Sequence, residues 1–213
     1  MRGQGGHAIE MTNVLTKPEQ FFAELSARGA SLKTPFVIVL IAAIVAAISN
    51  AMTSGVMAPS FPRGAGASMY RSATIRVIRG FIVPFGSWLL CSGVFYGISR
   101  LFRGHGSFER VFEFVGYGFI PNIVGSVIGL VVIMVVPQNE LLFESFQQIH
   151  PLILVFSIIQ LLLMLCTVII WIFAVKQARN IGTKHAIITV LAMPAILCLL
   201  GGVILCLVYA GVM

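Results

Sequence analysis

Residues 104–125, GHGSFERVFEFVGYGFIPNIVG, contain the transition that decides the fold. The stretch begins with a Gly-His-Gly turn and continues through the charged residues Glu109, Arg110 and Glu113. It then becomes almost wholly apolar, with Gly116 and Pro121 early in the run. A polar turn that leads into a hydrophobic helix is typical of a chain entering a membrane. We therefore predict that a membrane span begins here.

The composition of the whole chain also indicates a membrane protein. Of the 213 residues, 58% are hydrophobic and only 10% are charged, whereas soluble domains carry about 25% charged residues. The chain contains no Asp, and its seven Glu lie outside the most apolar runs. The net charge of +7 comes from basic residues that flank these runs. We therefore expect the lipid bilayer, including anionic lipids, as a partner, and no nucleic acid.

Five apolar stretches are each long enough to cross a hydrocarbon core of about 30 Å. The predicted spans are 35–58, 80–101, 114–136, 152–175 and 186–210. The expected fold class is all-α, a polytopic bundle of five transmembrane helices with a short N-terminal amphipathic helix. The chain then divides into a cytoplasmic N-terminal segment, residues 1–33, and a membrane domain, residues 34–213.

The amphipathic helix is predicted over residues 17–28. Thr16 and Glu19 have the spacing of a capping box, and Pro18 suits the first helical turn. The apolar side of this helix consists of Phe21, Phe22 and Leu25. Two alternatives remain open: the helix lies in the lipid headgroup region, or it packs on the protein's own membrane domain.

The distribution of Lys and Arg predicts the orientation of the five spans. With the N-terminus in the cytoplasm, ten basic residues lie inside and four lie outside, which favours a cytoplasmic N-terminus and an external C-terminus by the positive-inside rule. The arginines of the loop 59–79 oppose this assignment. We expect them to lie on an interfacial helix over 68–79 and to extend toward lipid phosphates.

Two motifs together resemble the Yip1 domain family. The first has the pattern L-x-x-P-x-x-F-F-x-x-L, which begins at Leu15 and ends at Leu25. The second is SFERVFEFVGYGFIP, which leads into the third span, and its sharpest matches are Gly116, Tyr117 and Pro121. The resemblance extends over nearly the whole chain, from about residue 13 to residue 210.

This resemblance implies five helices, a cytoplasmic N-terminus and a protein that is not an enzyme. Eukaryotic members of the family act in early secretory traffic and interact with prenylated small GTPases and with one another. The N-terminal region of this chain is short and lacks the acidic, Gly-Pro-bearing segment of those members. We therefore expect a prokaryotic member in the plasma membrane, for which a GTPase-related role is in doubt.

The polar residues give no pattern that indicates catalysis or a bound cofactor. Catalysis needs converging groups such as a nucleophile with a base or paired carboxylates, and the spans contain no acid or His near their centres. The motifs HExxH, GxSxG and Walker A are absent. The four His are scattered, and the four Cys lie in apolar runs without a CxxC pair. We expect no enzyme activity, cofactor or metal site.

The charged turn before the third span is the candidate partner surface. Glu109 and Glu113 lie one helical turn apart with Arg110 beside them. They could contact a cytoplasmic partner or form an ion-pair latch to Arg100, Arg103 or Lys176. The alternative is a solvated helix start, at which Glu also favours the positive end of the helix dipole.

Glycine and proline give the candidate packing and kink positions. Pro84, Pro121 and Pro194 fall within predicted spans and are expected to kink them. Gly116 is expected to allow close helix packing. Tyr117 either hydrogen-bonds across the bundle or lies at interface depth, as aromatic residues often do.

The expected function is interaction rather than catalysis. The partners would be the lipid bilayer, an unidentified membrane or cytoplasmic protein, and further copies of the chain in a homo-oligomer. A transporter or channel for a neutral or lipid-like molecule is the rival hypothesis, because helices interrupted by Gly and Pro are typical of transporters. The near absence of intramembrane charge argues against transport of ions.

Overall fold

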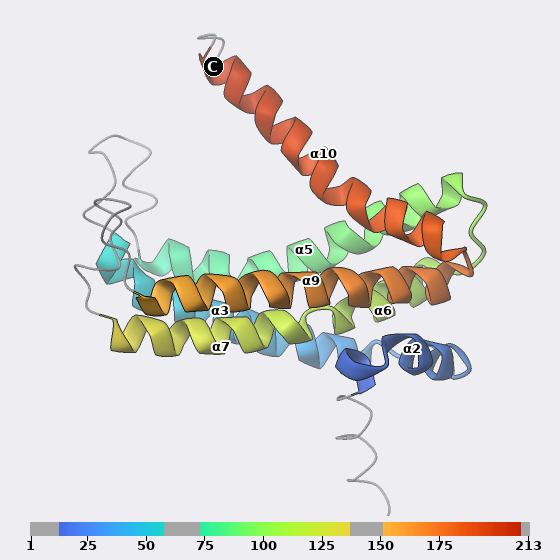
Figure 1. Cartoon of the computed structure of the whole chain (residues 1–213), viewed down its shortest axis with the longest axis horizontal. Coiled ribbons are helices and arrows are strands. Elements are labelled where there is room, and N and C mark those ends of the chain that lie inside the picture. The colour runs from blue at the N-terminus through green and yellow to red at the C-terminus, as the bar shows by residue number, and fades with distance from the viewer. Residues whose placement is uncertain (1–12, 58–72, 137–150, 210–213) are drawn as a thin grey trace, which may run out of the picture. The chain divides into compact units, whose positions relative to one another are not determined.

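The computed structural model describes residues 13–57, 73–136 and 151–209, and the elements in this part of the chain are all helices (Figure 1). This result confirms the all-α fold class. The helices are α2 (Pro18–Ser26), α3 (Lys33–Met57), α5 (Ala73–Leu101), α6 (Phe108–Tyr117), α7 (Ile120–Val135), α9 (Pro151–Arg179) and α10 (Thr183–Tyr209).

Among the described residues, four helical stretches are long and apolar enough to cross a membrane. They are Lys33–Thr53, Thr74–Leu101, Phe108–Val135 and Pro151–Arg179, and Thr183–Ile196 in α10 is a shorter apolar helix. Large apolar side chains stay exposed along them, among them Ile158, Leu161 and Leu165 on α9. Such exposure is costly in water but favourable in hydrocarbon. The chain is therefore a polytopic helical membrane protein.

The second expected span begins earlier than the sequence suggested. Helix α5 starts at Ala73, so residues 73–79 are its first turns and do not form a separate interfacial helix; residues 68–72 lie outside the described residues. Arg76 is only 6% exposed and does not extend outward. Gly80 lies within α5 and allows close packing, since a Cβ there would lie 2.9 Å from the carbonyl oxygen of Ala46 on α3.

The third expected span consists of two helices. Helix α6 ends at Tyr117 and α7 begins at Ile120, and the Phe119 N–H bonds the Gly116 carbonyl instead of the carbonyl four residues back. Pro121 occupies the first turn of α7, where its missing N–H costs little. By contrast, Pro84 and Pro194 lie inside α5 and α10.

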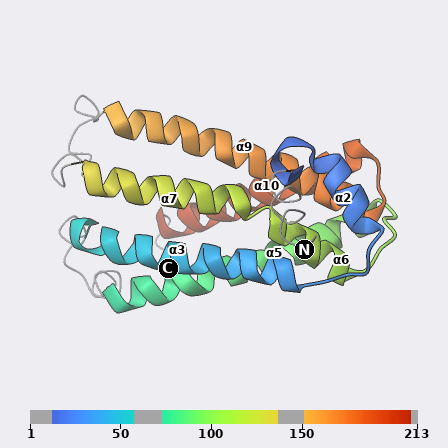
Figure 2. The ribbon, with the colours of Figure 1, turned by 90° about the horizontal axis from the view of Figure 1, so that it is seen from below.

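The chain forms two compact units. One comprises residues 32–89 and 116–167, and its helices lie side by side in the order α9, α7, α3 and α5 (Figure 2). Small residues make the approach of these helices close. A Cβ at Gly129 of α7 would lie 3.1 Å from the ring of Phe156 on α9. Between α3 and α5 the contact is aromatic: the rings of Phe36 and Phe85 are 5.8 Å apart.

The other unit contains residues up to 31, residues 90–115 and residues from 168 onward. It includes α2, the C-terminal part of α5, most of α6, the C-terminal part of α9 and the whole of α10. Its buried apolar residues include Phe22, Phe95, Phe114, Ile170 and Val175. The charged residues that the sequence singles out lie in this unit.

Candidate functional site

Helix α6 carries the charged residues of the candidate site. Ser107 precedes the helix, and its Oγ accepts the Arg110 N–H at 3.3 Å, which caps the first turn. Val111 and Phe114 are buried on one side, whereas Phe108 and Glu109 are exposed. The helix thereby presents an exposed first turn and fixes its apolar side within the protein.

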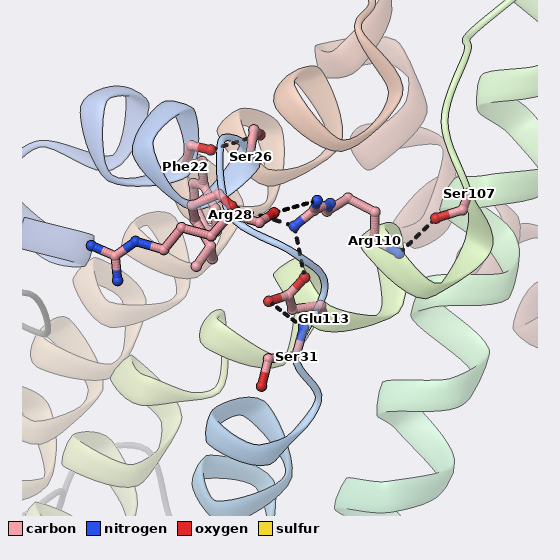
Figure 3. A network of polar contacts seen from close by, with 8 residues as sticks. Phe22, Ser26, Arg28, Ser31, Ser107, Arg110 and Glu113 are labelled. Carbon is pink, nitrogen blue, oxygen red and sulfur yellow. Dashed lines mark hydrogen bonds and ion pairs between the residues drawn. The ribbon is translucent and has the colours of Figure 1, made fainter.

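Glu113 lies on the inner part of α6, where its side chain is 1% exposed. Its Oε1 accepts the backbone N–H of Ser31 at 3.1 Å, and its Oε2 lies 3.3 Å from the Nη1 of Arg110 (Figure 3). A buried carboxylate is costly unless it is paired and hydrogen-bonded. Both conditions are met here, so Glu113 attaches the N-terminal segment to α6.

Arg110 binds the same segment through its carbonyl groups. Its Nη1 donates to the Leu25 carbonyl at 3.3 Å and its Nη2 to the Arg28 carbonyl at 2.7 Å (Figure 3). Carbonyls at a helix C-terminus lack partners within the helix, and a cation there also favours the helix dipole. Arg110 therefore stabilises the end of α2 and fixes the chain that follows it.

The ion pairs of the described residues differ from the latch, which was one of the alternatives for this turn. Glu113 pairs with Arg110 of its own helix and not with Arg100, Arg103 or Lys176. Lys176 pairs instead with Glu19 of α2, at 2.5 Å between Nζ and Oε1. The alternative of a solvated helix start agrees with the exposure of Glu109 but not with that of Glu113.

Helix α2 packs on the protein, as in the second alternative for this segment. Phe21 and Phe22 are buried, and the Phe22 ring lies 5.0 Å from that of Phe114 on α6. Leu25 is partly exposed. The expected capping box does not form, because Lys17 occupies the N-cap position without a side-chain cap. Glu19, which would have completed the box, pairs with Lys176.

A second polar cluster joins the α5–α6 turn to the end of α9. Arg179 is 2% exposed, and its Nε donates to Ser99 Oγ at 2.9 Å. Its two terminal nitrogens donate to the carbonyls of Gly104 and Gly106. The guanidinium carbon also lies 4.6 Å from the centre of the Tyr96 ring. Each of the three nitrogens of this buried cation therefore donates to an acceptor, and the guanidinium also lies over an aromatic face.

The backbone of the α5–α6 turn, residues 102–107, also bonds the end of α9, where the α9–α10 turn, residues 180–182, begins. The His105 N–H donates to the Arg179 carbonyl at 2.9 Å. Gly106 has φ of +144°, which favours glycine, and a Cβ there would collide with the Ala178 carbonyl. The α5–α6 turn is consequently fixed against the end of α9.

The end of α6 is supported from α9. Because the Phe119 N–H bonds Gly116, the Val115 carbonyl lacks its usual partner in the helix. The indole N–H of Trp171 on α9 donates to that carbonyl at 3.1 Å. The rings of Trp171 and Phe95 are 5.5 Å apart, which holds the indole in place. Trp171 thus supplies the hydrogen bond that the Val115 carbonyl lacks where α6 ends.

Residues 116–121 include the end of α6 and the start of α7. Gly116 and Tyr117 are both buried, and a Cβ at Gly116 would lie 2.6 Å from the Cβ of Pro35 and 3.2 Å from Nε1 of Trp88. A side chain at position 116 would therefore collide with α3 and α5. Pro121 is buried at the start of α7.

Sequence reasoning missed three residues of this site. Arg179 gave no sign that its charge would be buried, because it stands in a basic turn beside other cations. Ser31 contributes only its backbone N–H, which no sequence pattern marks. Trp171 resembles any aromatic residue in an apolar span. The described residues contain no group of three His, Cys, Asp or Glu that could hold a metal ion.

Comparison with known proteins gives the family of the chain. The Yip1 domain model matches residues 12–205. An uncharacterized protein of the archaeon Methanocaldococcus jannaschii is 39% identical over 120 residues, which are 56% of this chain and 85% of that protein. This relative supports a prokaryotic member. No solved structure matches. The matched region includes α2, α6 and the two turns, and the chain belongs to the Yip1 domain family.

Proposed function

We propose that this protein is a non-enzymatic membrane protein that acts by binding protein and lipid, as an organiser of the membrane or an adaptor. The observation that carries the proposal is the use of its charged residues. Arg110, Glu113 and Arg179 bind main-chain atoms of the protein itself. They support a fixed surface built from α2, α6 and the two turns.

The first turn of α6 is the proposed contact with a protein partner. Glu109 is exposed, and Phe108 beside it is 36% exposed. Aromatic residues are enriched in protein interfaces, and polar groups surround the interface core as a rim. The three bonds from Arg110 and Glu113 to residues 25–31 hold this turn in place, so a partner would meet a preformed surface.

The proposed location is the prokaryotic plasma membrane, with the N-terminus in the cytoplasm and the C-terminus outside. The excess of basic residues on the predicted inner segments supports this orientation. The α5–α6 and α9–α10 turns would then face the cytoplasm. The partner would be a membrane or cytoplasmic protein, or a second copy of the chain.

Affinity purification from native membranes tests the protein contact. The full-length protein should recover a stoichiometric partner, and Glu109→Lys should remove most of that partner because it reverses the exposed charge. Glu24→Lys, which reverses an exposed charge on α2, should leave recovery unchanged. The absence of a stoichiometric partner, or equal losses in the two variants, would contradict the proposal.

The break between α6 and α7 favours a second candidate, a transporter or channel for a neutral or lipid-like molecule. Interrupted helices form the binding sites of many transporters, and Asn122 lies exposed just after the break. In liposomes, flux of a solute through the purified protein that is lost in Asn122→Ala or Pro121→Ala would favour this function. Efflux from these liposomes at the rate of protein-free ones would favour the adaptor.

A further inference from the structure

The turns α5–α6 and α9–α10 gather exposed basic side chains. Arg100, Arg103 and His105 are exposed at the first turn, and Lys184 and His185 at the second. These residues come from parts of the chain about 80 positions apart. Their exposure leaves them accessible to a ligand outside the protein.

Contacts between the two turns bring these residues together. The rings of Phe102 and His185 lie 4.7 Å apart, so the neighbouring Arg103 and Lys184 belong to one surface. The His105 N–H bonds the Arg179 carbonyl, and the Arg179 side chain binds the carbonyls of Gly104 and Gly106. The buried Arg179 thus fixes the α5–α6 turn, which carries the exposed Arg103 and His105.

The charge of this surface is not neutralised by the protein. Within the described ranges, Lys176 pairs with Glu19 and Arg110 pairs with Glu113. No carboxylate in these ranges forms an ion pair with Arg103 or Lys184. The guanidinium of Arg100 lies over the Tyr96 ring, which leaves its charge intact. The sequence has no acidic residue between 100 and 108 or after 144.

We infer that this surface, formed by Arg100, Arg103, His105 and Lys184, binds the headgroups of anionic phospholipids. Each turn directly follows a long apolar helix, so it lies where headgroups lie. Leu101, which is 79% exposed, stands beside Arg100, and Ile188, which is 52% exposed, follows Lys184 by one helical turn. Apolar side chains next to cations match a ligand with a phosphate and acyl chains better than a free phosphate.

The inference deepens the lipid part of the proposed function and rests on it for the placement of the turns at the membrane surface. It does not depend on the protein contact at Glu109. Loss of a protein partner and loss of lipid binding are measured separately, so failure of one leaves the other standing.

Thermal unfolding of the full-length protein in a neutral detergent, with increasing phosphatidylglycerol, tests the inference. Phosphatidylglycerol should raise the Tm, and phosphatidylcholine or inorganic phosphate should not. In R103N/K184Q, half-maximal stabilisation should need a higher lipid fraction, by about fivefold for each charge removed. Asn suits position 103, because Arg103 has φ of +54° and Asn tolerates this region.

Two further variants make the result specific. K17Q/K33Q removes the same charge from exposed positions outside the two turns and should respond to phosphatidylglycerol as the wild type does. R103K/K184R keeps the charge and should also respond normally. An unchanged response of R103N/K184Q would overturn the inference, as would equal losses in both charge-removing variants. An equal Tm increase with inorganic phosphate would assign the surface to a free anion instead.

Discussion

Glu113 and Arg179 show how single charged residues are used in this protein. Each is almost wholly buried. Glu113 accepts a main-chain N–H and pairs with Arg110, and Arg179 donates to a hydroxyl and two carbonyls. Removing one member of such a group leaves the others without partners, which costs more than the net value of the bonds. Their contribution is therefore to fix local chain geometry.

Glu113→Ala should lower the free energy of unfolding by about 2 kcal/mol, because the Ser31 N–H loses its acceptor and Arg110 loses the carboxylate with which it pairs. Thermal unfolding in detergent, followed by tryptophan fluorescence, measures the change. Glu109→Ala is the matched control, and its exposed side chain should contribute less than about 0.5 kcal/mol. A similar loss in both variants would show that the burial of Glu113 contributes little.

At the scale of helices, close approach depends on a few small residues. Gly116 meets Pro35 and Trp88, and Gly80 meets α3. Other glycines, such as Gly86 and Gly97 of α5, have no atom near the position of a Cβ. A side chain would therefore collide with neighbouring residues at Gly80 and Gly116, whereas there is space for one at Gly86 and Gly97.

Gly116→Ala should destabilise the protein by about 1–3 kcal/mol, because the new methyl group overlaps Pro35. Gly86→Ala should be neutral or stabilising by up to about 1 kcal/mol, since Ala favours a helix and space is available. Unfolding midpoints of the two variants in the same detergent check this. Equal midpoints would mean that the Gly116 contact relaxes without cost.

The sequence predicts the helices of this protein much better than their contacts. Hydropathy identifies apolar runs because burial in lipid requires them, and the fold class follows. The break before Ile120 was predicted only as a kink at Pro121, and the bond from Trp171 to the Val115 carbonyl at this break has no local signal in the sequence. The same holds for Glu113, whose surroundings come from residues about 80 positions earlier. Such long-range contacts leave no local pattern.

At the scale of the whole molecule, orientation remains a prediction. In a cysteine-free background, single cysteines replacing Glu10, His105, Ser145 and Met213 should react with a membrane-impermeant thiol reagent from opposite sides. Positions 10 and 105 should react from the cytoplasm and positions 145 and 213 from outside, because five spans place them so. Any other division would contradict the five-span model with a cytoplasmic N-terminus.

The attachment of residues 25–31 has a consequence for how this segment can change. Arg110 and Glu113 bind its carbonyls and one N–H, and the side chains of Ala27 and Ala30 are exposed. Arg110 and Glu113 thus bind the main chain of the segment and not its side chains. Evolution or design can replace these exposed side chains, whereas inserting or deleting a single residue would change the spacing between the bonded groups of Leu25, Arg28 and Ser31.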